Sequence, residues 1–299
     1  MEFIKAHGTG NDFVVLIDLE DRLEVSALLV RALCDRRRGV GADGVIRIGG
    51  ARPGAAAFMD YRNADGSTVE MCGNGVRVVA KVLVDRGLAA PDAAGSVHID
   101  TRAGIRPVTV HQGADGRVAE VTVDMGAPEF DPGRVPFVPA LPASPVPGRH
   151  HLEVDGQAVE FTAVSMGNPH AVLAAMDVER APVGELGPRL ERHPSFPAGV
   201  NVGFAEVAGP GRIRLRVWER GVGETAACGT GACAAVVALQ GTGEVGEQVA
   251  VDLPGGRLMV SHRAGGSVMM TGPAVEVADG RLTTAWLEAA GRGELEAGS

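Results

Sequence analysis

The chain has 299 residues, and 45% of them are hydrophobic, which is enough for packed cores and excludes wholesale disorder. Its 28 basic and 37 acidic residues give a net charge of −9, which argues against nucleic acid or an anionic membrane as the main partner. No stretch has the apolar length of a membrane span, no signal-peptide pattern opens the chain, and four cysteines are too few for a disulfide scaffold, so we expect a cytoplasmic protein.

The first 50 residues predict two strands, a helix and a turn. Residues 1–18 have the pattern of a strand, a Gly-rich turn and a second apolar strand, and 26–35 that of a helix capped by Ser26. The three arginines at 36–38 are expected to form the solvated end of this helix. Residues 39–44 fit the GxGxxG pattern, but they follow arginines rather than a strand, so we reject a dinucleotide site.

A cysteine at the start of a helix is the first chemical signal. The segment MCGNG at 71–75 is a Gly-rich turn that leads into an apolar, helix-compatible stretch at 78–84. The first N–H groups of a helix and the positive end of its dipole favour the thiolate form of a cysteine at that place. Cys72 is therefore a candidate nucleophile or base. A single copy of this pattern would more often be a buried structural cysteine.

A proline-rich segment between Gly126 and His151 is expected to join two halves of the chain. Its seven prolines exclude a helix or an interior strand. Short alternating segments around it predict half-buried strands, at 118–124, 159–164 and 213–218.

The second half repeats the first. ACGTG at 227–231 matches the first cysteine segment, and Cys228 follows Cys72 by 156 residues. GNDFVVL at 10–16 likewise matches GNPHAVL at 167–173, and Glu219 precedes Cys228 by nine residues, as Asn63 precedes Cys72. Several matches at nearly one offset indicate a duplication.

We therefore expect an α/β (α+β) protein of two pseudo-symmetric domains. Each domain is expected to wrap its strands around one central helix, with the N-terminal cysteine of that helix facing a cleft between the domains, where the active site would lie. The predicted domains are residues 1–126 with 273–299, the C-terminal segment returning to the first domain, and residues 127–272.

The motifs together resemble those of the diaminopimelate epimerase family. They are HGTGNDF at 7–13, NADGS at 63–67, MCGNG, MGNPH at 166–170, VNVG at 200–203, WERG at 218–221 and ACGTG, and the resemblance spans residues 1 to 285 in order. It implies an isomerase of lysine and peptidoglycan precursor biosynthesis that interconverts LL- and meso-diaminopimelate. It also implies that no pyridoxal phosphate, other cofactor or metal is needed, and that the enzyme is a homodimer. At one position, Gly44, some family members have a glutamine that touches substrate, and glycine cannot make that contact.

Residue chemistry supports the same mechanism. Inversion by proton transfer needs a base on one face of the α-carbon and an acid on the other, and thiolate and thiol exchange these roles. One proton is then shared by two thiols. The N–H groups at the two helix starts, those of Gly73, Asn74, Gly229 and Thr230, could converge on the α-carboxylate.

The resemblance implies roles for further polar residues. Glu219 would meet the α-ammonium group, and His170 would orient a cysteine or a polar neighbour. The residues expected to hold the substrate are Asn11, Asn63, Asn168, Asn201 and Arg220, with Arg220 on the distal carboxylate. Taken singly, Asn168 before a proline is as readily a turn residue, and Arg220 a surface charge.

Other functions stay open at this level. A racemase of the same fold with another substrate, such as a proline racemase, would keep both thiols. A thiol–disulfide redox protein lacks a CxxC motif here, and a binding protein would not need two cysteines. A pyridoxal enzyme needs a Schiff-base lysine, and the chain has only Lys5 and Lys81, neither with a phosphate cradle that we can identify. Cys34 and Cys233 are expected to be buried core thiols, and no zinc-site spacing is present.

Overall fold

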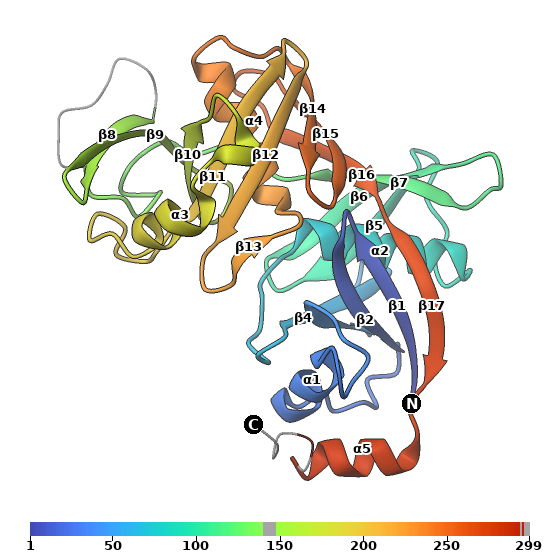
Figure 1. Ribbon diagram of the computed structural model, residues 1–299. Coiled ribbons are helices and arrows are strands. Elements are labelled where there is room, and N and C mark those ends of the chain that lie inside the picture. The colour runs from blue at the N-terminus through green and yellow to red at the C-terminus, as the bar shows by residue number, and fades with distance from the viewer. Residues whose placement is uncertain (140–147, 294, 296–299) are drawn as a thin grey trace. The chain divides into compact units, whose positions relative to one another are not determined.

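The computed structural model describes residues 1–139, 148–293 and 295 (Figure 1). Its contacts divide the chain into two compact units, Met1–Val123 with Gly272–Ser299 and Asp124–Thr271. We call them unit 1 and unit 2. Three prolines of the predicted join, Pro142, Pro145 and Pro147, lie outside the described residues.

Unit 1 contains the N-terminal elements and the last strand and helix of the chain. Its elements are β1 (Glu2–Gly8), β2 (Asn11–Asp18), α1 (Ala27–Cys34), β3 (Gly44–Gly49), β4 (Ala57–Asn63), α2 (Gly73–Asp85), β5 (Ser96–Thr101), β6 (Gly104–Gln112), β7 (Val118–Asp124), β17 (Val275–Arg281) and α5 (Thr284–Gly291).

Unit 2 contains the elements between β7 and β17. They are β8 (Arg149–Val154), β9 (Gln157–Ser165), β10 (Pro169–Ala174), the 3₁₀ turn η1 (Val178–Arg180), α3 (Val183–Glu191), β11 (Asn201–Gly209), β12 (Arg212–Glu219), β13 (Gly223–Thr225), α4 (Gly229–Gly241), β14 (Gln248–Leu253), β15 (Gly256–His262) and β16 (Val268–Pro273), the last of which crosses the boundary between the units.

The two units have the same pattern of strand pairing, although the first strand of unit 1, β17, comes last in the chain. In unit 1 the pairing runs β17–β1–β2–β3–β4–β5–β6–β7, and in unit 2 it runs β8–β9–β10–β11–β12–β14–β15–β16. The parallel pairs occupy equivalent places, β2–β3 and β4–β5 in one unit and β10–β11 and β12–β14 in the other. Each parallel pair is joined by a crossover segment that contains a helix, as parallel strands require. The repeat seen in the sequence is thus a repeat of the strand-pairing pattern.

A buried helix lies at the centre of each unit. Ten of the thirteen residues of α2, and ten of the thirteen of α4, are buried. In unit 1, α2 packs against β1, β4, β5, β6 and β17, and in unit 2, α4 packs against β9, β10, β11, β12, β14 and β15. A helix apolar on nearly every side is stable only when it is surrounded. The α/β fold with strands around a central helix is therefore confirmed.

The predicted local elements are also present. Ser26 caps α1 by accepting a hydrogen bond from the Leu29 amide, and the strands expected at 118–124, 159–164 and 213–218 are β7, β9 and β12. The expected core cysteines, Cys34 and Cys233, are buried. Among the described residues, no helix is long and apolar enough to cross a membrane.

The arginines at 36–38 follow the end of α1 and are exposed, as expected. The helix ends at Cys34, and the Arg36 guanidinium donates to the Asp12 carboxylate at 2.8 and 3.1 Å and to Asp43 at 2.7 Å. Lys5 also donates to Asp12, at 2.6 Å. These charges lower the pKa of Asp12, although burial opposes them. Arg36 thus ties the end of α1 to the start of β2.

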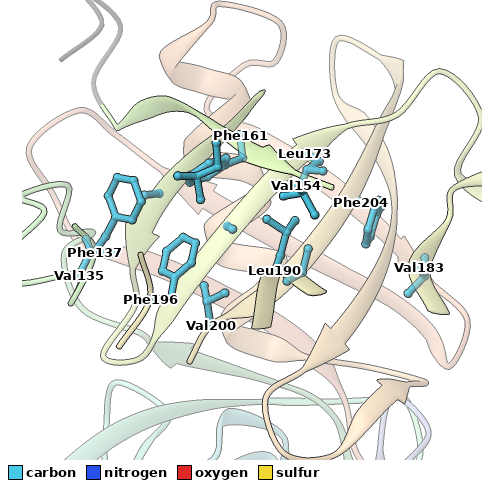
Figure 2. Packing of buried hydrophobic residues seen from close by; sticks show 14 residues of the cluster. Val135, Phe137, Val154, Phe161, Leu173, Val183, Leu190, Phe196, Val200 and Phe204 are labelled. Carbon is cyan, nitrogen blue, oxygen red and sulfur yellow. The ribbon is translucent and has the colours of Figure 1, made fainter. Parts of the chain in front are cut away.

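Two residues in the described part of the proline-rich join belong to the core of unit 2. Val135 and Phe137 are buried in a cluster with Phe161, Leu190 and Phe196, as Figure 2 shows. The rings of Phe137 and Phe161 meet edge to face with centroids 5.6 Å apart. The described residues of the join form no helix, as expected, but two of them contribute apolar side chains to the packing.

Candidate active site

Cys72 is the N-cap residue of α2. Its backbone is extended, with φ −139° and ψ 115°, and its Sγ accepts a hydrogen bond from the Gly75 amide at 3.4 Å. The first backbone hydrogen bond of the helix runs from the Val76 amide to the Cys72 carbonyl, at 2.9 Å. The amides of Gly73 and Asn74 precede this bond, at the positive end of the helix dipole.

Cys228 repeats this geometry at the start of α4. Its φ and ψ are −117° and 110°, and Sγ accepts from the Gly231 amide at 3.4 Å. The Ala232 amide donates to the Cys228 carbonyl at 2.9 Å. Gly229 and Thr230 here take the places of Gly73 and Asn74. Each unit therefore presents a sulfur beside the first amides of its central helix.

In unit 1, two asparagines lie beside the cysteine. Asn11, the first residue of β2, has its Oδ1 4.0 Å from Sγ of Cys72. The same Oδ1 accepts a hydrogen bond from Nδ2 of Asn74 at 3.2 Å, while Nδ2 of Asn11 donates to Asp43 at 2.9 Å. The structure thus brings together Asn11, Cys72, Gly73 and Asn74, four of the predicted site residues.

Asn63 lies at the end of β4, the strand that pairs with β3 on the side opposite β2. Its register partner is Gly44, which itself pairs with Phe13 of β2. The Oδ1 of Asn63 accepts from the Tyr61 hydroxyl at 3.1 Å, and its Nδ2 donates to Ser67 Oγ at 3.1 Å. Asn63 is therefore held at the same end of these strands as Asn11.

In unit 2, a carboxylate and a hydroxyl lie near the second sulfur. Burial raises the pKa of the Cys228 thiol well above its usual value, and the negative charge of Glu219 raises it further. Oγ1 of Thr230 lies 3.5 Å from Sγ, and the hydroxyl of Thr225 donates to Glu219. Cys228 is accordingly a thiol at neutral pH.

His170 is buried and pairs with a predicted neighbour. It is 1% exposed, and its Nε2 lies 2.9 Å from Oδ1 of Asn168. Burial, and then the charge of Arg220, lower the pKa of His170 to about 3. His170 is therefore neutral at physiological pH, and it holds Asn168, a polar neighbour, rather than carrying charge.

Asn201 links the starts of β10 and β11 to the end of β12. Its Nδ2 donates to the Pro169 carbonyl at 3.0 Å, and its Oδ1 accepts from the Arg220 amide at 3.0 Å. The exposed guanidinium of Arg220 donates to the Ala198 carbonyl at 2.6 Å. The buried Asn201 thus fixes the backbone of Arg220, while the charged end of that side chain is at the surface.

Sequence reasoning missed several residues of these two clusters. Thr225 holds Glu219, Asp43 holds Asn11, and Tyr61 holds Asn63. Arg77, fully buried in α2, was also missed. Arg77 gave a signal in the sequence, as a charge inside an otherwise apolar helical run.

The two lysines are held by carboxylates. Nζ of Lys5 lies 2.6 Å from Asp12, and Nζ of Lys81 lies 2.7 Å from Asp85 and 2.6 Å from the Val118 carbonyl. Within the described part of the chain, no group of three or more His, Cys, Asp or Glu side chains could hold a metal ion.

Both cysteine segments lie within the part of the chain that matches a known family. The family model described as diaminopimelate epimerase matches residues 3–130 and 162–277, most of the chain. The chain belongs to the diaminopimelate epimerase family. It is therefore an isomerase of the racemase and epimerase class.

Individual members of this family are similar over nearly their full length. The diaminopimelate epimerase of Thioalkalivibrio sulfidiphilus is 49% identical over 286 residues, which cover 94% of this chain and 99% of that protein. That of Pseudomonas savastanoi pv. phaseolicola is 45% identical over 285 residues, again 94% of this chain and 99% of the relative.

Solved structures with much lower identity share the fold of this family member. A hydroxyproline epimerase from Agrobacterium vitis gives a TM-score of 0.64 at 20% identity, covering 94% of this chain and 90% of that one. A phenazine biosynthesis protein of the PhzF family from Bacillus anthracis gives 0.66 at 15% identity, covering 95% and 99%. At these identities the likeness concerns the fold alone.

Proposed function

We propose that this chain interconverts LL- and meso-diaminopimelate by moving the α-proton between Cys72 and Cys228. The observation that carries the proposal is the matched geometry of the two cysteines, each an N-cap whose Sγ accepts from the amide three residues on at 3.4 Å. Family membership and relatives of 45 to 49% identity support the substrate.

The reaction conserves its protons. One cysteine, as thiolate, removes the α-proton and becomes a thiol, while the other, as thiol, donates its proton to the opposite face of the α-carbon and becomes a thiolate. The enzyme then holds the opposite protonation pattern, which suits the reverse direction. We therefore expect the two thiols to titrate as one coupled pair.

Negative charge develops at the α-carbon and its carboxylate, so the site must stabilise an anion. We propose that the amides of Gly73 and Asn74 in one unit, and of Gly229 and Thr230 in the other, bind the α-carboxylate from two helix N-termini. Glycine at the first position lets the backbone approach the ligand without a Cβ in the way.

Glu219 is proposed to bind the α-ammonium group. Its charge raises the pKa of Cys228 in the free protein. A bound ammonium group would offset that charge and lower the pKa of the Cys228 thiol toward the range in which it can act as a base. The arrangement thereby links substrate binding to activation of the sulfur.

The remaining polar residues are proposed to recognise the rest of the substrate. Arg220 would pair with the distal carboxylate and give up its contact with the Ala198 carbonyl. The other proposed contacts come from Asn11, Asn63, Asn168 and Asn201, with His170 holding Asn168 in place.

We also propose that units 1 and 2 correspond to the two epimerase domains with boundaries near 126 and 272, and that the protein is a cytoplasmic homodimer. The family resemblance supports each of these points. Light scattering on the purified protein tests the dimer, and a monomer at micromolar concentration would contradict it.

The decisive experiment is a coupled assay of the reduced protein with LL-diaminopimelate, without added pyridoxal phosphate or metal. Formation of the meso isomer in D₂O, with deuterium at the α-position of the product, is expected. Inversion without solvent exchange would rule out the two-thiol mechanism. Turnover of proline or hydroxyproline in place of diaminopimelate would favour the other racemases that share this fold.

A further inference from the structure

A strained turn precedes Asn11 in unit 1. Thr9 and Gly10 connect β1 to β2 as a two-residue hairpin, since Gly8 and Asn11 are register partners. Both turn residues have positive φ, 56° for Thr9 and 81° for Gly10. Hairpins of this kind favour Asn-Gly or Asp-Gly, and a β-branched residue at positive φ is an outlier. Such strain persists only where the surroundings impose it.

Arg77 supplies that constraint. Its side chain is fully buried in α2, and Nη2 donates to Oγ1 of Thr9 at 2.8 Å. The same guanidinium donates to the Gly73 carbonyl at 3.4 Å and to the Pro273 carbonyl at 3.3 Å. Arg77 therefore connects the strained turn to the first residue of α2, which directly follows Cys72.

The turn also packs closely on the helix start. A Cβ on Gly8 would lie 2.9 Å from the Asn74 carbonyl oxygen and 3.1 Å from Nη2 of Arg77. Thr9 is 1% exposed, so its hydroxyl has left water to make this bond. The contact brings the residue after the turn, Asn11, into hydrogen-bond range of Asn74 and within 4.0 Å of the Cys72 sulfur.

We propose that Thr9 and Arg77 are positioning residues that fix Asn11 against Cys72. The strain at Thr9 is offset by its bond to a buried guanidinium, and the register of β2 is thereby set relative to the first turn of α2. The inference rests on the proposed function for its catalytic consequence, because it assumes that Cys72 acts on the substrate.

Replacement of the hydroxyl tests the proposal. Thr9→Val keeps the shape and the β-branch but removes the bond to Arg77, whereas Thr9→Ser keeps the bond. We expect Thr9→Val to lower kcat by between about tenfold and a hundredfold, with KM changed much less, because a misplacement of about 1 Å has effects of this size. Thr9→Ser should stay close to the wild type.

Thr9→Gly separates positioning from stability. Both Thr9→Gly and Thr9→Val lose the bond to Arg77, but glycine adopts the positive φ without strain, so Thr9→Gly should be no less stable than Thr9→Val, while kcat should fall equally in the two variants. If Thr9 had only a structural role, kcat would instead follow the melting temperature across the variants. Wild-type kcat in both Thr9→Val and Thr9→Gly would overturn the proposal.

A thiol measurement keeps the proposal independent of the substrate. In a Cys228→Ala background, the rate at which iodoacetamide alkylates Cys72 is followed by mass spectrometry with and without Thr9→Val. Faster alkylation in the variant is expected, since Asn11 would no longer be fixed beside the sulfur. An unchanged alkylation rate would count against the positioning role of Thr9 and Arg77, even if the wild type epimerises diaminopimelate. Faster alkylation in the variant together with an inactive wild type would reject only the proposed function.

Discussion

The amide nitrogen of Gly231 lies 3.4 Å from Sγ of Cys228, to which it donates a hydrogen bond. This bond stabilises a thiolate, yet burial and the Glu219 carboxylate act against it, and the pKa of Cys228 is raised. The sulfur at the start of α4 is therefore held as a thiol in the free protein, although a helix N-terminus by itself would favour the thiolate. Its surroundings, more than the helix, set its protonation state.

Removal of either N-cap sulfur should abolish epimerisation. Cys72→Ala and Cys228→Ala each delete one of two groups that must act together, and Cys72→Ser and Cys228→Ser leave a hydroxyl that is a far poorer base at neutral pH. We expect a fall in kcat of at least about a thousandfold, near the upper range for loss of a general acid or base. The coupled assay measures it.

Cys34→Ala is the matched control for the cysteine variants. Burial raises the pKa of the Cys34 thiol to about 12, so this sulfur is inert at neutral pH. Its removal from the core should cost stability but leave kcat near that of the wild type. Full activity in either Cys72→Ala or Cys228→Ala would exclude the two-thiol mechanism.

Glu219→Gln should lower the pKa of Cys228. The negative charge of Glu219 is one cause of the raised pKa, and the amide removes the charge while keeping the size of the side chain. The pH dependence of Cys228 alkylation, measured in a Cys72→Ala background, should move to lower pH. Glu224→Gln is the control, because Arg216 already holds that carboxylate at 2.6 Å. If the pH dependence of Cys228 alkylation moved equally in both variants, the effect would not be specific to Glu219.

The sequence could predict the elements that carry the site because each depends on local chemistry. Alternation predicted β7, β9 and β12, and the Gly-rich turns predicted helices beginning at the two cysteines. These features follow from period, capping and turn geometry within one segment.

The partners of the site residues could not be predicted in this way, because they are brought together by strand register and packing. Arg36 meets Asp12 across 24 positions, and Arg77 meets Thr9 across 68. Phe137 was expected in a linker but fills the core of unit 2, since its proline neighbours prevent regular structure without preventing burial.

The stability of the protein should fall in mild acid because of His170. Its pKa is about 3 in the folded protein and near 6.5 when unfolded, so the unfolded chain binds the extra proton between these values. The resulting loss of stability is small above pH 6.5 and grows as the pH falls, to about 2 kcal/mol at pH 5. Urea unfolding of the wild type and of His170→Gln between pH 5 and pH 8 measures it.

The difference in unfolding free energy between the wild type and His170→Gln should therefore depend on pH. In His98→Gln, which alters an exposed histidine, the wild-type pH dependence should be nearly unchanged. A wild type and a His170→Gln variant with parallel pH curves would show that His170 is not buried in its neutral form.

Gly44, where some relatives are expected to have a substrate-contacting glutamine, should not tolerate a side chain. A Cβ there would lie 2.5 Å from the Arg62 carbonyl oxygen and 2.5 Å from Cε2 of Tyr61. Because Tyr61 also donates to Asn63, displacement of its ring would disturb a proposed substrate contact. We expect Gly44→Ala to lower the free energy of unfolding by about 1–3 kcal/mol and to raise KM for diaminopimelate.

Gly184→Ala in the first turn of α3 is the matched control, since a Cβ there meets no atom within 4 Å. This substitution should cost no stability and should add up to about 1 kcal/mol, because alanine loses less backbone entropy in a helix. Urea unfolding and KM measured on both variants make the comparison. If Gly44→Ala were as stable as Gly184→Ala, the contact between β3 and Tyr61 would not be tight, and the absence of a side chain at residue 44 would need a functional explanation rather than a steric one.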